Sequence, residues 1–125
     1  MENADPSHDW IHYPDDVRVA NAYRGPTLGG MERTPLTPDE IAAALADLDG
    51  WELRDGCLHR EVALADFRDA FAFMTRVAFD AEELNHHPNW ANVWNRVTID
   101  LSTHSAGGIT GLDLELARRI SAHVA

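Results

Sequence analysis

The spacing of apolar residues changes from a helical period to a strand period between residues 67 and 101, and this change restricts the possible folds more than any other feature. Apolar residues recur at helical intervals from Phe67 to Leu84, which predicts an amphipathic helix. From Asn92 the period becomes two, which predicts one long, one-sided strand. The expected buried positions are Phe67, Ala70, Phe71, Met74, Val77, Ala78, Ala81 and Leu84 in the helix, and Val93, Val97, Ile99 and Leu101 in the strand. A helix followed by a one-sided strand is typical of a sheet covered by helices on one face.

A shorter helix is expected upstream. Thr37 can cap it, Pro38 suits its first position, and Glu40 completes a capping box. Gly50 is placed to end it. Its predicted apolar stripe consists of Ile41, Ala44, Leu45 and Leu48.

Two further patterns complete the expected fold. Asp55 and Gly56 lie between two alternating runs, which predicts a β-hairpin with a tight turn. Thr110 and Asp113 form a pattern like a capping box before a third apolar helical stripe. The predicted order is therefore α-β-β-α-β-α, in an α+β fold whose antiparallel sheet carries three helices on one face.

The length of 125 residues fits one domain with a real core. Residues 1–33 show no sustained periodicity and are interpreted as an irregular N-terminal extension, and residues 34–125 as the domain. No apolar run approaches the roughly 20 residues of a membrane span, and no signal peptide is evident, so a cytoplasmic location is expected. The net charge of -11 disfavours direct binding to nucleic acid or acidic membranes. Small molecules or proteins are the expected partners.

Three histidines are candidates for catalytic residues. The stretch LNHHPNWANVWNRV contains His86 and His87 after the second helix, and His104 follows the expected long strand. If both element ends meet at one rim of the sheet, the imidazoles share a cleft. Because histidine has an unperturbed pKa of ~6.5, one ring can donate a proton while another accepts one. The alternative interpretation is that these are surface or capping histidines near turns.

Two other chemistries are less well supported. Three histidines plus water can form a catalytic zinc centre, but adjacent histidines usually diverge, and no carboxylate has obvious ligand spacing. No metal is therefore expected. A nucleophilic hydrolase is also disfavoured, because Ser102 and Ser105 lack a G-x-S-x-G context and Cys57 is remote in sequence.

The neighbours of the histidines allow two interpretations each. Pro88 can end the helix or contact a ligand, and Trp90 can pack in the core or stack on a planar ring. Trp94 allows the same two roles. Asp113 is interpreted as a helix cap that can also orient His104.

Residues 71–120 resemble the pterin-4a-carbinolamine dehydratases, through the motif H-H-P-x-W-x-N-V-W-N-x-V and a later S-T-H. The similarity extends more weakly back to about Leu36. Asn85, Asn89 and Ala91 depart from residues seen in some relatives.

The resemblance implies that the protein dehydrates a 4a-hydroxytetrahydropterin, formed by aromatic amino acid hydroxylases, to a quinonoid dihydropterin. The pterin is then the substrate, and no cofactor is expected. The resemblance implies that the three histidines are catalytic, and the candidate substrate contacts are Asn85, Pro88, Trp90, Ser102, Thr103 and Ser105. It also implies a homodimer or homotetramer. Because animal relatives act as dimerisation cofactors for a homeodomain transcription factor, a non-enzymatic protein-binding scaffold is the main alternative.

Overall fold

The computed structural model describes residues 34–124, so the proposed extension at residues 1–33 lies outside the described residues. The elements follow one another in the order α3 (Pro38–Leu45), β2 (Glu52–Arg54), β3 (Cys57–Ala63), α4 (Phe67–Leu84), β4 (Asn89–Val93), β5 (Arg96–Leu101), the short 3-10 helix η3 (His104–Ala106) and α5 (Gly111–Val124). The four strands form one antiparallel sheet in the order β2-β3-β5-β4. The predicted α+β class is confirmed.

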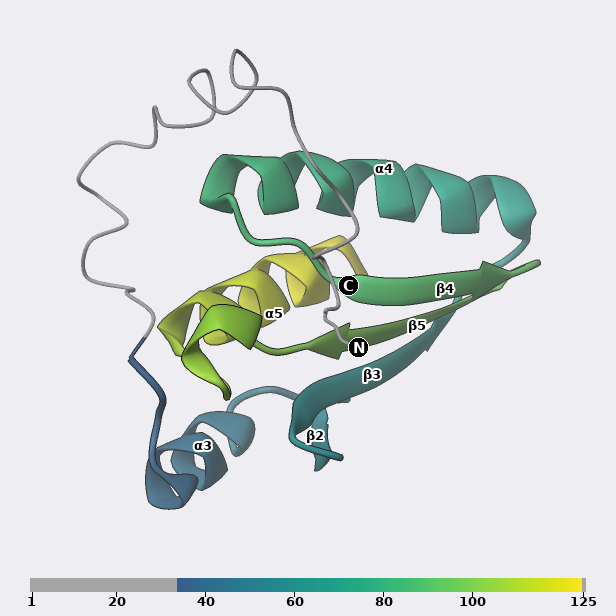
Figure 1. Ribbon diagram of the computed structural model, residues 1–125. Helices are drawn as coiled ribbons and strands as arrows, with labels where there is room; N and C mark the ends of the chain where they lie inside the picture. The colour runs from purple at the N-terminus through teal and green to yellow at the C-terminus, as the bar shows by residue number, and fades with distance from the viewer. Residues whose placement is uncertain (1–33, 125) are drawn as a thin grey trace, which may run out of the picture.

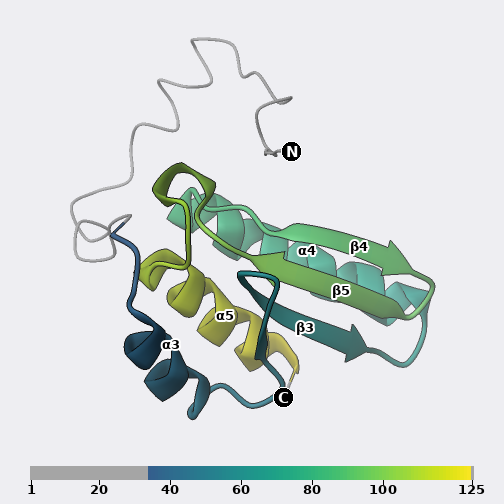
Figure 2. The ribbon, with the colours of Figure 1, turned by 60° about the horizontal axis from the view of Figure 1, so that its bottom comes forward.

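The helices α4 and α5 lie side by side and pack against the sheet, and α3 lies beside α5 (Figures 1 and 2). Facing side chains from the strands and helices form the core, which includes Leu58, Val97, Ile99, Phe73, Val77, Leu116 and Ile120. Burying such side chains stabilises the fold by roughly 1.5 to 3 kcal/mol each. In the described residues, no helix is long and apolar enough to cross a membrane.

Local sequence signals explain most element boundaries. Thr37 and Glu40 form the expected capping box at the start of α3, and Asp66 caps α4. Asp55 and Gly56 both have positive φ, which fits the predicted tight turn between β2 and β3. Gly50 does not end α3, because this helix already stops at Leu45.

The segment expected as one long strand is a hairpin. β4 and β5 pair antiparallel, and Trp94 adopts a left-handed conformation with φ of 50° in the turn between them. The alternation is therefore interrupted before Arg96. Val97, Ile99 and Leu101 are buried as expected, but Val93 is 74% exposed, so its predicted burial is wrong.

The buried face of α4 also differs from the expected stripe. Ala70, Val77, Ala81 and Leu84 are buried as predicted, together with Phe73. The apolar spacing runs along two sides of this helix, and only one side can face the sheet. The predicted core positions Phe67, Phe71 and Ala78 lie on the exposed side.

Candidate functional site

The expected convergence of the histidine segments occurs at one end of the sheet. There, the end of α4, the start of β4, the end of β5, η3 and the start of α5 come together (Figure 1). His86 follows α4, Thr103 follows β5, and Asp113 lies in the first turn of α5. Hydrogen bonds connect these three residues directly. Residues from three separate segments of the chain thus meet in one small site.

The end of α4 fixes the position of His86. Asn85 is the C-cap residue in a left-handed conformation, with φ of 50°, which asparagine tolerates better than most residues. The backbone N–H of His86 then donates to the carbonyl oxygen of Ala81 at 2.9 Å. Asn85 therefore ends the helix, and Pro88 lies outside it, just before β4.

Asp113 is the buried centre of the site. Its side chain is fully buried, and its Oδ1 accepts from Nε2 of His86 at 2.5 Å. Its Oδ2 accepts from the hydroxyl of Thr103 at 2.8 Å and from the backbone N–H of Thr110 at 2.9 Å. Three donors therefore surround one carboxylate, which is the arrangement that lets a charged carboxylate remain buried.

The donor directions determine which ring nitrogen of His86 carries a proton. The Thr103 hydroxyl donates its one hydrogen to Asp113. In the 2.7 Å contact between the hydroxyls of Thr103 and Thr110, Thr110 must therefore be the donor. An ionised Asp113 can only accept, so Nε2 of His86 carries a proton. Nδ1 is then the ring nitrogen of His86 that is not bonded to Asp113.

His87 and His104 have more open surroundings than His86. The Nε2 atom of His87 lies 2.9 Å from a carboxylate oxygen of Glu82, and 32% of the His87 side chain is exposed. His104 is exposed at the first position of η3. His86, in contrast, is 6% exposed. One imidazole is therefore buried and oriented by Asp113, and the other two are more accessible to solvent.

The expected role of Asp113 is corrected in one respect. It does cap the start of α5 through the N–H of Thr110, but it orients His86 and not His104. Glu82, as the partner of His87, has no simple sequence signal, because His87 lies beyond the end of the helix that carries Glu82.

The remaining candidate contacts fall into different environments. Thr103 is buried in the Asp113 network, Ser102 is half-buried and Ser105 is exposed on η3. Trp90 pairs with Ile99 in the sheet and packs against the core, which supports its packing role. Pro88 is half-buried, and Trp94 is 64% exposed in the hairpin turn, away from the core.

Cys57 lies at the start of β3 and is half-buried. Burial raises the pKa of the Cys57 thiol, and an interaction with Ser102 acts in the opposite direction. A thiol held protonated is a poor nucleophile. Within residues 34–124, no group of three or more histidine, cysteine, aspartate or glutamate side chains is arranged to hold a metal ion.

Comparison with known proteins identifies the family of this chain. The family model for pterin 4 alpha carbinolamine dehydratase matches residues 34–123. The chain belongs to this family. A relative from Solibacter usitatus is 53% identical over 89 residues, which are 71% of this chain and 94% of the relative. A relative from Synechococcus is 55% identical over 88 residues, covering 70% of this chain and 95% of the relative.

Both relatives carry the name pterin-4-alpha-carbinolamine dehydratase. A solved structure from Brucella melitensis confirms the fold: it is 42% identical, has a TM-score of 0.72, and covers 74% of this chain and all of the other. That protein is called a transcriptional coactivator/pterin dehydratase. The resemblance carried by the histidine motifs is therefore confirmed at the level of the family.

Proposed function

We propose that the protein removes water from a 4a-hydroxytetrahydropterin to give a quinonoid dihydropterin, by acid-base catalysis with His86, His87 and His104. The observation that carries this proposal is the hydrogen-bonded pair of His86 and Asp113, in a chain of this family. The reaction protonates the leaving hydroxyl at C4a and removes the proton on N5. Such proton transfers suit imidazoles at neutral pH.

The arrangement supports different tasks for the three rings. Asp113 fixes the orientation of His86 and leaves its Nδ1 for the substrate. His87 and His104 are accessible enough to exchange protons with substrate or water. Asn85, Pro88, Ser102, Thr103 and Ser105 surround the histidines in the chain, and we retain them as candidate contacts for the pterin ring. Trp90 is better explained by packing.

The function is tested by mixing freshly generated 4a-hydroxytetrahydropterin with the protein and following ultraviolet absorbance by stopped flow. We expect dehydration faster than in buffer, with saturation as the substrate concentration rises. The alternative is a protein-binding scaffold without enzymatic activity, an idea favoured by the coactivator name of the Brucella structure. A scaffold alone would leave the dehydration rate at the buffer value.

We also propose that the protein forms a homo-oligomer through the exposed side of α4. Phe71 is 58% exposed and Phe79 is 74% exposed, and residues spaced by four or eight lie on the same side of a helix. The Phe67 and Phe71 rings lie 5.9 Å apart, so the apolar surface is continuous there. A contiguous apolar surface of this kind marks an interaction site, and a second copy would present the same surface.

Replacing Phe71 and Phe79 by glutamate should therefore lower the molecular mass in solution to that of a smaller assembly, because burying two carboxylates in an apolar interface is unfavourable. Light scattering after size-exclusion chromatography measures the mass. Arg76→Glu, on the flank of the same helix, is the matched control and should leave the mass unchanged. An unchanged mass for the double variant, with the wild type oligomeric, would place the interface elsewhere.

Removal of residues 1–30, so that the chain starts at Met31, should leave dehydratase turnover and thermal stability unchanged. The family model begins only at residue 34, and the removed segment contains none of the histidine motif. Turnover and the thermal midpoint of the shortened chain are compared with those of the full chain. A folded, shortened protein that has lost its turnover would give the extension a part in catalysis.

A further inference from the structure

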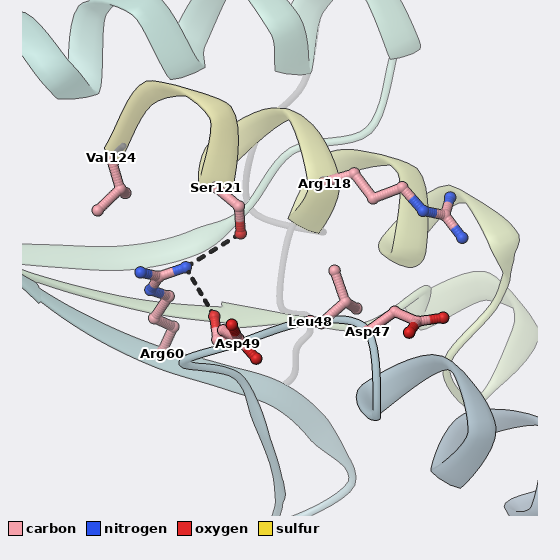
Figure 3. A pocket seen from close by; sticks show the side chains of 7 residues that line it. All are labelled: Asp47, Leu48, Asp49, Arg60, Arg118, Ser121 and Val124. Atoms are coloured by element: carbon pink, nitrogen blue, oxygen red, sulfur yellow. Dashed lines mark hydrogen bonds between the residues drawn. The ribbon is translucent and has the colours of Figure 1, made fainter.

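A pocket lies at the other end of α5 from the histidine site. Asp113 is in the first turn of this helix, whereas Ser121 and Val124 are in its last turns. Together with the loop after α3 and a residue of β3, these last turns enclose a pocket of about 380 Å³ (Figure 3). This volume lies near the lower end of the range typical of small-molecule sites. The dehydratase reaction proposed above makes no use of it.

Arg60 supplies a part-buried cation to this pocket. Its guanidinium lies over the ring of Trp51, 5.9 Å from the centroid, and its Nη1 donates to the carbonyl oxygen of Asp49 at 3.1 Å and to Ser121 Oγ at 3.0 Å. These acceptors are neutral. Within residues 34–124, no carboxylate forms an ion pair with Arg60. Burial lowers its pKa, and the charge of Asp49 acts in the opposite direction.

Ser121 adds a hydroxyl donor. Its oxygen already accepts two hydrogen bonds, from Nε1 of Trp51 at 2.9 Å and from Nη1 of Arg60 at 3.0 Å. A hydroxyl has two lone pairs and one hydrogen, so these bonds occupy its acceptor capacity and leave the hydrogen to donate. In the described part of the chain, no acceptor is bonded to it. Arg60 and Ser121 therefore present donors to the same anionic group.

The backbone of the neighbouring loop leaves room for this arrangement. Gly50 has φ of 89°, and a Cβ atom there would come within 2.8 Å of the guanidinium carbon of Arg60. Any larger residue would both strain the backbone and displace the guanidinium.

The charges around the pocket select the class of ligand. Arg60 and Arg118 are balanced by Asp47 and Asp49, so a simple anion would be repelled by the carboxylates and by the net charge of -11. A simple cation would be repelled by the two arginines. A zwitterion carries a negative group that can pair with an arginine and a positive group that can pair with a carboxylate. Figure 3 shows Leu48 between the Arg60 side and the Asp47 side, which gives the pocket an apolar surface between its charged groups.

We propose that this pocket binds a small α-amino acid with an apolar side chain. Its carboxylate accepts from Arg60 and Ser121, its ammonium group faces the carboxylate of Asp49, which lies beside Arg60 in Figure 3, and its side chain contacts Leu48. The amino acid is a bound ligand here and undergoes no reaction.

Titration of the ¹⁵N-labelled full-length protein, followed by nuclear magnetic resonance, tests the proposal with three matched probes. L-leucine carries both charges, 4-methylpentanoate lacks the ammonium group, and 3-methylbutylamine lacks the carboxylate. We expect L-leucine to shift amide signals of the pocket residues saturably, and each half-ligand to bind at least about tenfold more weakly. The proposal would be overturned if L-leucine caused no saturable shift, or if a half-ligand bound with equal affinity. It would also be overturned if only amide signals outside the pocket shifted.

Variants separate ligand binding from structural effects. Asp49→Asn removes a charge from a side chain that is exposed, so the fold should persist. It should weaken L-leucine binding by about threefold without weakening 4-methylpentanoate binding. Arg60→Gln should weaken both by about tenfold or more, whereas the distant control Arg76→Gln should change neither. Unchanged L-leucine affinity in Asp49→Asn would contradict the proposed placement of the ammonium group, even if Arg60→Gln failed to fold.

Discussion

Replacing Asp113 by alanine is expected to lower the free energy of unfolding by about 3 kcal/mol or more. The carboxylate is fully buried and accepts hydrogen bonds from His86, Thr103 and Thr110. Alanine would leave all three donors without their acceptor in a place that water does not reach, and it would remove the cap of α5. Urea denaturation followed by circular dichroism measures the change.

Asp80→Ala is the matched control for this variant. Asp80 also pairs with a histidine, His123, at 2.6 Å, and this pair also joins α4 to α5. The Asp80 side chain is 21% exposed, so water can replace the lost contact, and we expect a loss of only about 1 kcal/mol. Equal losses for the two variants would show that the buried network around Asp113 has no special importance for stability.

Alanine at His86, His87 or His104 is expected to lower dehydratase turnover by about 100-fold, the lower limit for general acid-base groups. The lower limit applies because the hydroxypterin loses water readily without an enzyme. Since the three rings act on one transition state, the double and triple variants should lose less than the sum of the single free-energy losses. Stopped-flow turnover, after subtraction of the buffer rate, gives these values.

His123→Ala is the control for the histidine variants. His123 pairs with Asp80 near the end of α5, whereas the proposed catalytic histidines lie at the start of that helix. Its substitution should leave turnover unchanged. A loss in His123→Ala as large as in His104→Ala would mean that the effects arise from the fold and not from the chemistry.

Local signals in the sequence predicted the element types well, because they depend on neighbouring residues. The capping box of Thr37 and Glu40 and the turn at Asp55 and Gly56 are local patterns, and both are present. The turn at Trp94 was missed, because it lacks the glycine that usually marks a left-handed conformation. The alternation of apolar and polar residues continues through this turn by coincidence, so the sequence indicated one strand instead of two.

The buried side of α4 needed tertiary information. Apolar residues lie on both sides of this helix: Phe73 is on the buried side, and Phe71 and Phe79 are on the exposed side. Spacing alone does not decide which side faces the sheet, since an oligomer interface requires apolar residues as well.

The sequence indicated which segments of the chain meet at the candidate site, but not which side chains pair there. The sequence places His86, His87 and His104 near element ends, which indicates a shared site. The partner of Asp113 depends on how α5 packs against the end of α4, and this packing selects His86 over His104. Contacts between residues this far apart are set by helix packing and not by local propensity.

The central claim is that histidines catalyse the dehydration without a metal ion. Its most direct test is the stopped-flow dehydration rate of the wild-type protein before and after treatment with a chelator, compared with the triple variant of His86, His87 and His104. We predict a wild-type rate above the buffer rate that chelation leaves unchanged, and a rate near the buffer value for the folded triple variant. A wild-type rate equal to that of buffer, or activity that chelation abolishes and zinc restores, would contradict the account.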